Sequence, residues 1–524
     1  MKTKNIRLRA ALAGTTAVAA IGLINTAVAE EYRVNDDITI TTNVSLSAGI
    51  SFRTEDPSSE AIFAGNGARN GVAGVGGSAT QDDGTLNFDK GDVVTAPITV
   101  IADAEFNYRD DIGFFIRGKA VYDAALDQQR VNHGHSPNGY AADGFLDDEE
   151  FNTLAQFANA TILDAFLFGE VDAGPVPIEL RVGRQVVSWG EGTFIQNGIN
   201  SINPIDVNAF RRPGTQLKEG LLPLGMIYAN AGLTDNLSLE TFWNFEFQPT
   251  QLDGCGTFFS TADVAAQGCD ELSLATVAAA QVPLVQAGIG QVQAGIAAAQ
   301  AAGDAVTEAA LQAQLGVLQG QLAGLQFASD DAGASAAGFF QPRGPDRGPD
   351  DFDFDNFGVA ARYFADAIDT EFGFYVTRLD SRAPILSYTS GGSILDPNNP
   401  TNGFSPNSST YNVEYVEDVH TIGVSAATTL FGVALAGELS YRPDHPVQIN
   451  TNDLTAASIT AGTSSGVFTP VNPADALFLN LPEGTEVDGF IETNQIRAQA
   501  SAVAFFDRVI GADRVTAIGE FGIE

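Results

Sequence analysis

The chain has 524 residues and is strongly acidic, with 65 Asp and Glu against 26 Lys and Arg and a formal net charge of −39. Because nucleic acids bind to surfaces rich in Lys and Arg, this balance argues against a nucleic-acid partner. It fits solvated loops that hold divalent cations, and it fits equally well loops whose charges serve solubility alone.

The first 29 residues have the composition of a signal peptide. Basic residues lie within the first nine positions, an apolar stretch follows over 10–24, and Ala27-Val28-Ala29 forms a small-residue cleavage site. The apolar stretch is too short for a comfortable bilayer span. We therefore expect export, cleavage after Ala29, and a mature chain over 30–524 that forms one domain.

Beyond this leader, apolar and polar residues alternate over stretches of ten or more positions. The first such stretch runs from Ile38 to Phe52. It exceeds the usual ~5–6 residues of a globular strand and suits a strand that crosses a bilayer at a tilt. The pattern predicts an all-β protein, a transmembrane antiparallel β-barrel of the bacterial outer membrane.

Short turns and long loops alternate along the chain, and in barrels of this class the short turns face the periplasm. The segments between the turns give about 13 strands, the last from Arg514 to Glu524. Because an odd count cannot close an antiparallel barrel, we expect a C-terminally truncated chain and about 14 or more strands in the complete one. The alternative is that a weak strand near 416–428 is miscounted.

An acidic run from 82 to 92 resembles a calcium loop in composition. Its spacing does not follow the EF-hand series, so a turn-rich structural loop is the alternative. A second candidate metal-binding pair is His133-Gly134-His135, but no Cys or carboxylate at a recognised spacing completes it. We expect no other cofactor. The candidate Ca²⁺ ligands are Asp82, Asp83, Asp89 and Asp92.

The segment over 190–221 is too rich in Gly, Pro and Asn for a strand, and it carries too many apolar side chains for a solvated loop. We expect it to fold into the barrel lumen as a hatch, with Trp189 and Phe210 offering apolar contact to a substrate.

A basic cluster at 211–218 is unusual in so acidic a chain and could hold a carboxylate or another anionic head group. The alternative is that its cations pair with Glu191, Asp206 and Glu219 and only pin the loop. The candidate substrate-binding residues are Trp189, Glu191, Phe210, Arg211, Arg212 and Lys218.

An extracellular insertion over 253–345 interrupts the strand pattern. Apolar residues at spacings of three and four predict a helical hairpin over 272–327, with Asp304 capping its second helix. A transmembrane helix over 272–303 is disfavoured by the Gln, Gly and Pro residues in it. Cys255 and Cys269 are the only cysteines, and since an exported protein meets an oxidising compartment, we expect a disulfide between them.

Several stretches carry a more specific pattern. They are DDGTLNFDKGD over 82–92, RVGRQVVSWGE over 181–191, GINSINPID over 198–206, FRRPG over 210–214, LKE over 217–219 and GLTDNLSLE over 232–240. With these stretches, most of the mature chain resembles the proteobacterial outer-membrane family called domain of unknown function 1302. The Ala- and Gln-rich insertion departs from the family pattern, and so do the missing C-terminal strands.

The resemblance implies an outer-membrane barrel, often encoded near a periplasmic lipoprotein-like partner and near exporters of the resistance-nodulation-division type. These settings imply traffic of lipids, fatty acids, hydrocarbons or sterols. We therefore expect a channel that passes hydrophobic or amphipathic small molecules by passive diffusion. Outer-membrane lipid and lipopolysaccharide are its expected surroundings.

Two other functions remain open. A general porin for small hydrophilic solutes would suit the Ser, Thr, Asn and Gly residues on the polar strand faces, and a structural or adhesion barrel would work through its helical hairpin. We do not expect an enzyme. The G-x-S-x-G match at 462–466 lies in a Ser/Thr/Gly loop without the strand and helix that a nucleophile elbow requires.

Overall fold

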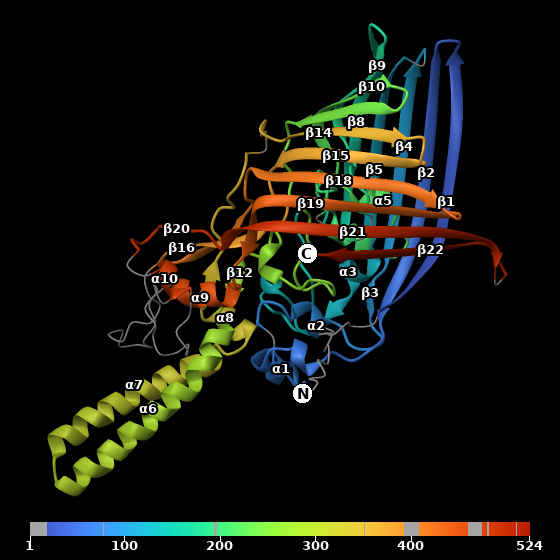
Figure 1. Cartoon of the computed structure of the whole chain (residues 1–524). Helices are drawn as coiled ribbons and strands as arrows, with labels where there is room; N and C mark the ends of the chain where they lie inside the picture. The colour runs from blue at the N-terminus through green and yellow to red at the C-terminus, as the bar shows by residue number, and fades with distance from the viewer. Residues whose placement is uncertain are drawn as a thin grey trace, which may run out of the picture.

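The structure is a computed structural model that describes residues 18–524 except 77, 110, 193–194, 196–197, 351, 392–407, 460–473, 479–480 and 510. Its main element is a 15-stranded antiparallel sheet in which the strands pair in the order of the chain (Figure 1). In that order the strands are β1 Val18–Asn35, β2 Ile38–Arg53, β4 Pro97–Tyr108, β5 Ile112–Asp123, β8 Ala158–Ala173, β9 Val176–Gln185, β10 Leu224–Thr234, β11 Leu237–Asn244, β14 Phe357–Ala365, β15 Thr370–Leu379, β18 Val419–Leu430, β19 Val433–Gln448, β21 Phe490–Val509 and β22 Ala512–Ile523, with β3 Val93–Thr95 paired to β2.

The strands of this order from β2 to β22 correspond to those counted from the sequence. The strand β1 was not among the counted strands. β1 includes residues 18–29 of the expected signal peptide, so cleavage after Ala29 would leave only Glu30–Asn35 of it. That cleavage stays a prediction. β1 and β22 lie at opposite ends of the strand order, and no pairing joins them among the described residues. The expected further strands also stay a prediction.

Tight turns and long loops alternate, as predicted. β4–β5, β10–β11 and β18–β19 are hairpins with short turns, whereas the long connections gather at the other end of the sheet with most of the helices (Figure 1). The helices are α1 Ala64–Asn70, α2 Asp83–Asn87, α3 Ala124–Gln128, α4 Val207–Arg211, α5 Leu217–Gly220, α6 Ala275–Ala302, α7 Ala305–Phe327, α8 Asp331–Ala336, α9 Thr451–Ile459 and α10 Asp475–Phe478. The short loop strands are β6 Arg130–Val131, β7 Gly144–Phe145, β12 Glu271–Ser273, β13 Phe340–Pro342, β16 Ile385–Thr389, β17 Thr410–Glu414 and β20 Glu486–Val487.

The two faces of the sheet are reversed relative to a sheet in water. On β15, Phe374 and Val376 are 54% and 52% exposed, whereas Tyr375 and Thr377, on the opposite face, are each 2% exposed. The same alternation continues on β19, where Leu439 is exposed and its polar neighbours are buried. An apolar outer face with a polar inner face is the pattern of strands surrounded by lipid. The fold is therefore a transmembrane β-barrel of the outer-membrane class, as predicted.

The inserted helical hairpin is formed by α6 and α7, which project from the loop end of the sheet (Figure 1). Gly303 closes α6 in the left-handed conformation at φ 68°, where glycine is favoured. The Asp304 carboxylate then accepts a hydrogen bond from the Thr307 N–H at 3.1 Å and caps α7, as predicted. Among the described residues, no helix combines the length and the apolar character needed to cross a bilayer.

Apolar side chains form separate cores inside the sheet and within the loop layer. Trp189, Ile202 and Phe242 belong to a core against the inner face of the sheet. In the loop layer, Tyr388 and Tyr411 belong to a second core that joins several long connections. The long acidic loops therefore pack against one another as a layer rather than extending separately into solvent.

Candidate functional site

The connection between β9 and β10, which we call the hatch (186–223), lies against the inner face of the sheet. It contains α4 and α5, and its apolar side chains Ile199 and Ile202 are buried. Polar side chains on β5, β11, β19 and β21 bind it from several directions. The described part of the segment 190–221 therefore lies among these inward-facing strand residues.

Glu438 on β19 anchors one end of the hatch. Its carboxylate accepts hydrogen bonds from the backbone N–H groups of Glu191 at 2.6 Å, Gly192 at 3.2 Å and Ile199 at 2.9 Å. A side chain on Gly198 would overlap the Glu438 carboxylate, so glycine allows the backbone to wrap around it. Glu438 is buried, so these charge-assisted bonds replace the water that its carboxylate has lost.

A buried ion pair anchors the other end. Lys119 Nζ on β5 lies 2.9 Å from Asp206 Oδ2, and both side chains are buried. The other oxygen of Asp206 accepts a hydrogen bond from the Ala209 N–H at 3.1 Å and so caps α4. One carboxylate therefore starts a hatch helix and ties it to the barrel wall.

Trp189 was predicted to contact substrate, but the structure places it wholly in the inner core. Its ring packs against Phe242 at a centroid distance of 4.8 Å, and Nε1 donates a hydrogen bond to Glu240 Oε2 at 2.8 Å. Arg362 on β14 also contacts Glu240, at 2.6 Å. In this conformation Trp189 holds the start of the hatch and has no surface left for a ligand.

The positive charge of the basic cluster is partly neutralised by Asp253, which was not among the predicted partners. Arg211 Nη1 pairs with Asp253 and donates to the Phe259 carbonyl at 2.6 Å, and its guanidinium lies over the Phe259 ring. Burial raises the pKa of Asp253 to about 6, although Arg211 and Arg212 oppose the shift. Of the acidic partners that were expected, Asp206 instead binds Lys119, and Glu219 accepts a hydrogen bond from the Gln216 N–H. Whether Glu219 also pairs with a cation of the cluster stays a prediction.

The remaining candidate residues whose side chains are described make separate contacts. Arg212 donates to the Leu154 carbonyl at 3.4 Å, and Phe210 is 39% exposed. Glu191 accepts from the Ser425 hydroxyl at 3.3 Å. The side chain of Lys218 lies outside the described residues. The cavity beside Arg211 and Arg212 measures about 30 Å³, which is too small for an amphipathic ligand.

A larger cavity of about 280 Å³ lies on the loop side of the hatch. Hatch residues form one wall, and the connection after β15 forms another. Arg382 in that connection is buried, and none of its three side-chain nitrogens has a hydrogen-bond partner among the described residues. Its guanidinium lies 4.7 Å from the centroid of the Phe247 ring. Burial lowers the pKa of Arg382 to about 10, although the carboxylates of Asp380, Asp353 and Glu246 oppose the shift.

A second cavity of about 440 Å³ adjoins the first, since Gln448 lines both. Its wall includes Leu252, Leu272, Leu274 and Val277 and is mainly apolar. The Gln448 amide is held by the backbone of Leu386, donating to its carbonyl at 2.9 Å and accepting from its N–H at 2.6 Å. A chamber lined by Arg382, Arg442 and Asp380 and a mainly apolar chamber thus lie on either side of Gln448.

A family model described as "Protein of unknown function (DUF1302)" matches residues 10–524. The chain belongs to the DUF1302 family. No curated protein matches the sequence of this DUF1302 chain.

Solved outer-membrane proteins are similar to the DUF1302 chain only at a low level. Salmonella typhi OmpF in complex with daunomycin has 8% identity and a TM-score of 0.29, over 83% of this chain and 74% of that one. The FrpB iron transporter of Neisseria meningitidis, F3-3 variant, has 7% identity and a TM-score of 0.31, over 94% of this chain and 57% of that one. OmpT of Vibrio cholerae has 9% identity and a TM-score of 0.22, over 97% and 88%. TM-scores at this level support no transfer of function.

The acidic run of this DUF1302 protein divides into two parts. Asp82 and Asp83 are buried in the loop layer. Asp89 and Asp92 lie on its surface, where the Asp92 carboxylate accepts from the Asp89 N–H at 2.7 Å and Asp89 accepts from Asn132 at 2.9 Å. The structure does not bring the four carboxylates together around one point, so the calcium loop predicted from composition does not form as one set.

The expected disulfide between Cys255 and Cys269 is present, and both residues belong to a loop-layer core with Phe88 and Phe151. Replacing both cysteines with serine should cost the loop layer about 3 kcal/mol in the chain-entropy model, because the bridge closes a short loop. Limited proteolysis in detergent should then cut within 255–269 faster than in the wild type and leave the barrel strands intact. Equal cleavage rates in the two proteins would contradict this role.

Glu438, Lys119, Glu240 and Arg382 were not predicted from the sequence. The first three are single inward-facing polar residues on strands, which resemble any lumen residue. Arg382 could have been recognised as a candidate binding residue, because it is a lone cation in an acidic loop close to Pro384. Its burial, however, depends on connections that lie far away in the sequence.

Proposed function

We propose that this protein is an outer-membrane channel whose hatch controls the passage of amphipathic small molecules with an anionic head group. The observation that carries the proposal is a pair of neighbouring chambers. One contains the Arg382 guanidinium, which makes no side-chain hydrogen bond among the described residues, and the other has mainly apolar walls. Their volumes, about 280 and 440 Å³, are comparable to those of small-molecule sites.

The chemistry of the two chambers supports a molecule with two unlike ends. A carboxylate would give Arg382 the bidentate hydrogen bonds that its planar guanidinium is shaped to make. A hydrocarbon tail in the second chamber would be removed from water at a gain of about 25 cal/mol per Å². Arg442, at the wall of the first chamber, donates to the hatch carbonyl of Gly198 at 2.6 Å. A bound head group would therefore lie beside a contact that holds the hatch.

Passage would be passive, because the concentration gradient of the solute alone would drive its release. The test is single-channel conductance of the full chain in a planar bilayer, with and without a long-chain fatty acid. Low ionic conductance with saturable fatty-acid binding would support the proposal. A large steady conductance that is indifferent to fatty acid would instead favour a general porin for hydrophilic solutes.

Replacing Arg382 with glutamine should weaken fatty-acid binding by about tenfold to a hundredfold. A hydrogen bond to a charged group contributes about 1.5–3 kcal/mol, and each 1.4 kcal/mol is about tenfold in affinity. Calorimetric titration in detergent measures the change. Arg109→Gln is the matched control, because Arg109 is an exposed arginine at the tight-turn end of the sheet. If Arg382→Gln weakens binding of the corresponding long-chain alcohol equally, Arg382 does not recognise the head group.

A further inference from the structure

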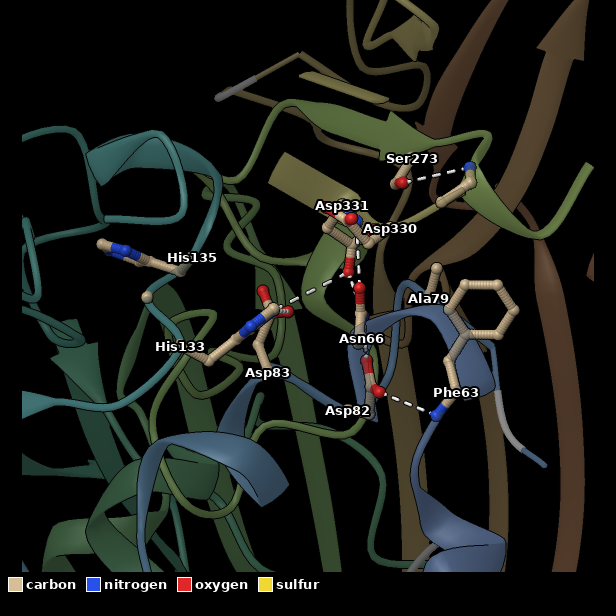
Figure 2. Close-up of polar contacts among 12 residues, drawn as sticks. Phe63, Asn66, Ala79, Asp82, Asp83, His133, His135, Ser273, Asp330 and Asp331 are labelled. Carbon is tan, nitrogen blue, oxygen red and sulfur yellow. Dashed lines mark hydrogen bonds and ion pairs between the residues drawn. The ribbon is translucent and has the colours of Figure 1, made fainter. Parts of the chain in front are cut away.

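Three buried side chains from three separate loops converge in the loop layer, away from the hatch (Figure 2). Asp83 begins α2, His133 lies between β6 and β7, and Asp331 begins α8, directly after the helical hairpin. Their exposed fractions are 2%, 1% and 0%. One oxygen of each carboxylate and a ring nitrogen of His133 all lie within 4.8 Å of one another. In Figure 2 His133 points toward the two carboxylates, whereas His135 points away from them.

Two of the converging atoms lack a partner. Among the described residues, Asp83 Oδ1 and His133 Nε2 are fully buried and make no hydrogen bond, and neither does Asp331 Oδ1, whereas Asp331 Oδ2 accepts from Asn66. His133 Nε2 lies 3.4 Å from Asp83 Oδ1 and 3.9 Å from Asp331 Oδ2, distances that suit an ion pair but not a hydrogen bond. A buried polar atom without a partner costs about 1–3 kcal/mol, and more when it is charged. A bound ligand would relieve this cost.

The distances fit a shared metal ion. Zn²⁺ holds imidazole nitrogens and carboxylate oxygens at about 2.0–2.2 Å, so two ligands at a tetrahedral angle lie about 3.4 Å apart. The His133–Asp83 distance has that value already, and a small movement would bring in Asp331. Imidazole is a ligand for zinc and similar transition metals, whereas Ca²⁺ takes six to eight oxygens. One imidazole with two carboxylates therefore favours the zinc class over calcium.

Neighbouring side chains orient the three residues. Asn66 donates to Asp331 Oδ2 and, at 2.9 Å, to Asp82 Oδ1, and its own oxygen accepts from the Asp331 N–H at 2.9 Å. The Asn70 amide lies 2.9 Å from His133 Nδ1 and leaves Nε2 directed at the carboxylates. A metal on Nε2 places the ring proton on Nδ1, so Asn70 must then turn its oxygen toward the ring.

We propose that Asp83, His133 and Asp331 bind one divalent cation of the zinc class, which ties two external loops to the base of the helical hairpin. The site stands apart from the hatch and does not depend on the proposed transport function. The competing description is a metal-free cluster in which a protonated His133 alone balances the carboxylates.

The test is metal binding by the folded full chain in detergent after chelation and dialysis. We expect one equivalent of Zn²⁺ per chain by calorimetry and elemental analysis. His133→Gln and Asp331→Asn should each weaken the binding by about tenfold or more, the range seen even for residues that only support a metal ligand. Asp89→Asn, in the same acidic run but at the surface, should bind as the wild type does.

Three results would overturn the proposal. They are no stoichiometric Zn²⁺ binding by the wild type, equal binding by all the variants, or tight Ca²⁺ binding without Zn²⁺ binding. Should the two ligand variants fail to fold, Co²⁺ added to the wild type serves as the probe. Visible absorption bands of a four-coordinate, imidazole-ligated Co²⁺ would support the site, and their absence would overturn it.

Discussion

Replacing Lys119 with methionine is expected to release the hatch from the barrel wall and to raise the ionic conductance of the channel several-fold. The substitution leaves Asp206 buried without its cation, and removing one partner of a buried ion pair costs about 3–5 kcal/mol. Because Asp206 also caps α4, the hatch helix loses its anchor as well. Single-channel recording in a planar bilayer measures the effect.

Two comparisons make this result specific. Lys90→Met removes an exposed lysine of the same charge and should leave the conductance unchanged. The double variant Lys119→Met with Asp206→Asn removes both charges while asparagine keeps a good cap, so it should recover most of the wild-type behaviour. Wild-type conductance in the Lys119→Met single variant would mean that the ion pair does not hold the hatch closed.

The second large effect is expected from Glu438→Ala. This change removes the acceptor of three backbone N–H groups in the hatch, and each bond to a charged group contributes about 1.5–3 kcal/mol. The segment from Glu191 to Ile199 should then leave the inner face for much of the time. Because the only two cysteines form a disulfide, an introduced Asn200→Cys would supply the single free thiol for a maleimide probe. Labelling of that thiol should become much faster in the Glu438→Ala background.

Glu492→Ala is the matched comparison, because Glu492 is an exposed carboxylate on the neighbouring strand β21. It should leave the labelling rate unchanged. Glu438→Gln should fall between the two, since an amide oxygen still accepts hydrogen bonds but carries no charge. If Glu438→Ala and the wild type are labelled at the same rate, the three bonds do not decide where the hatch lies.

The strands could be predicted from the sequence because alternation is a local property. Residues on either side of Phe374 or Leu439 already show which face is apolar, and the tight turns between strands are equally local. The helical hairpin was predictable for the same reason. Its capping residue Asp304 and its apolar spacing lie within one continuous stretch.

The contacts of the hatch could not be predicted in this way. The basic cluster suggested pairing within the hatch, but Arg211 pairs with Asp253 and Asp206 pairs with Lys119. Charge composition indicates that cations need partners, and it does not say which carboxylate the fold brings close. The three residues proposed to bind a metal ion could not be predicted together for the same reason, because Asp331 lies in a different loop from Asp83 and His133.

The hatch also constrains the order in which the barrel can be assembled. Its anchor on β19 joins residues 247 positions apart in the chain, Glu191 and Glu438, and Gln499 on β21 binds Ile195 across 304 positions. Contacts of such long range form late, because the intervening chain must first be ordered. Neighbouring strands can pair as they emerge, but the hatch cannot form all of its contacts with the barrel wall until β19 and β21 are in place. During assembly the interior is therefore open, and closure is among the last steps.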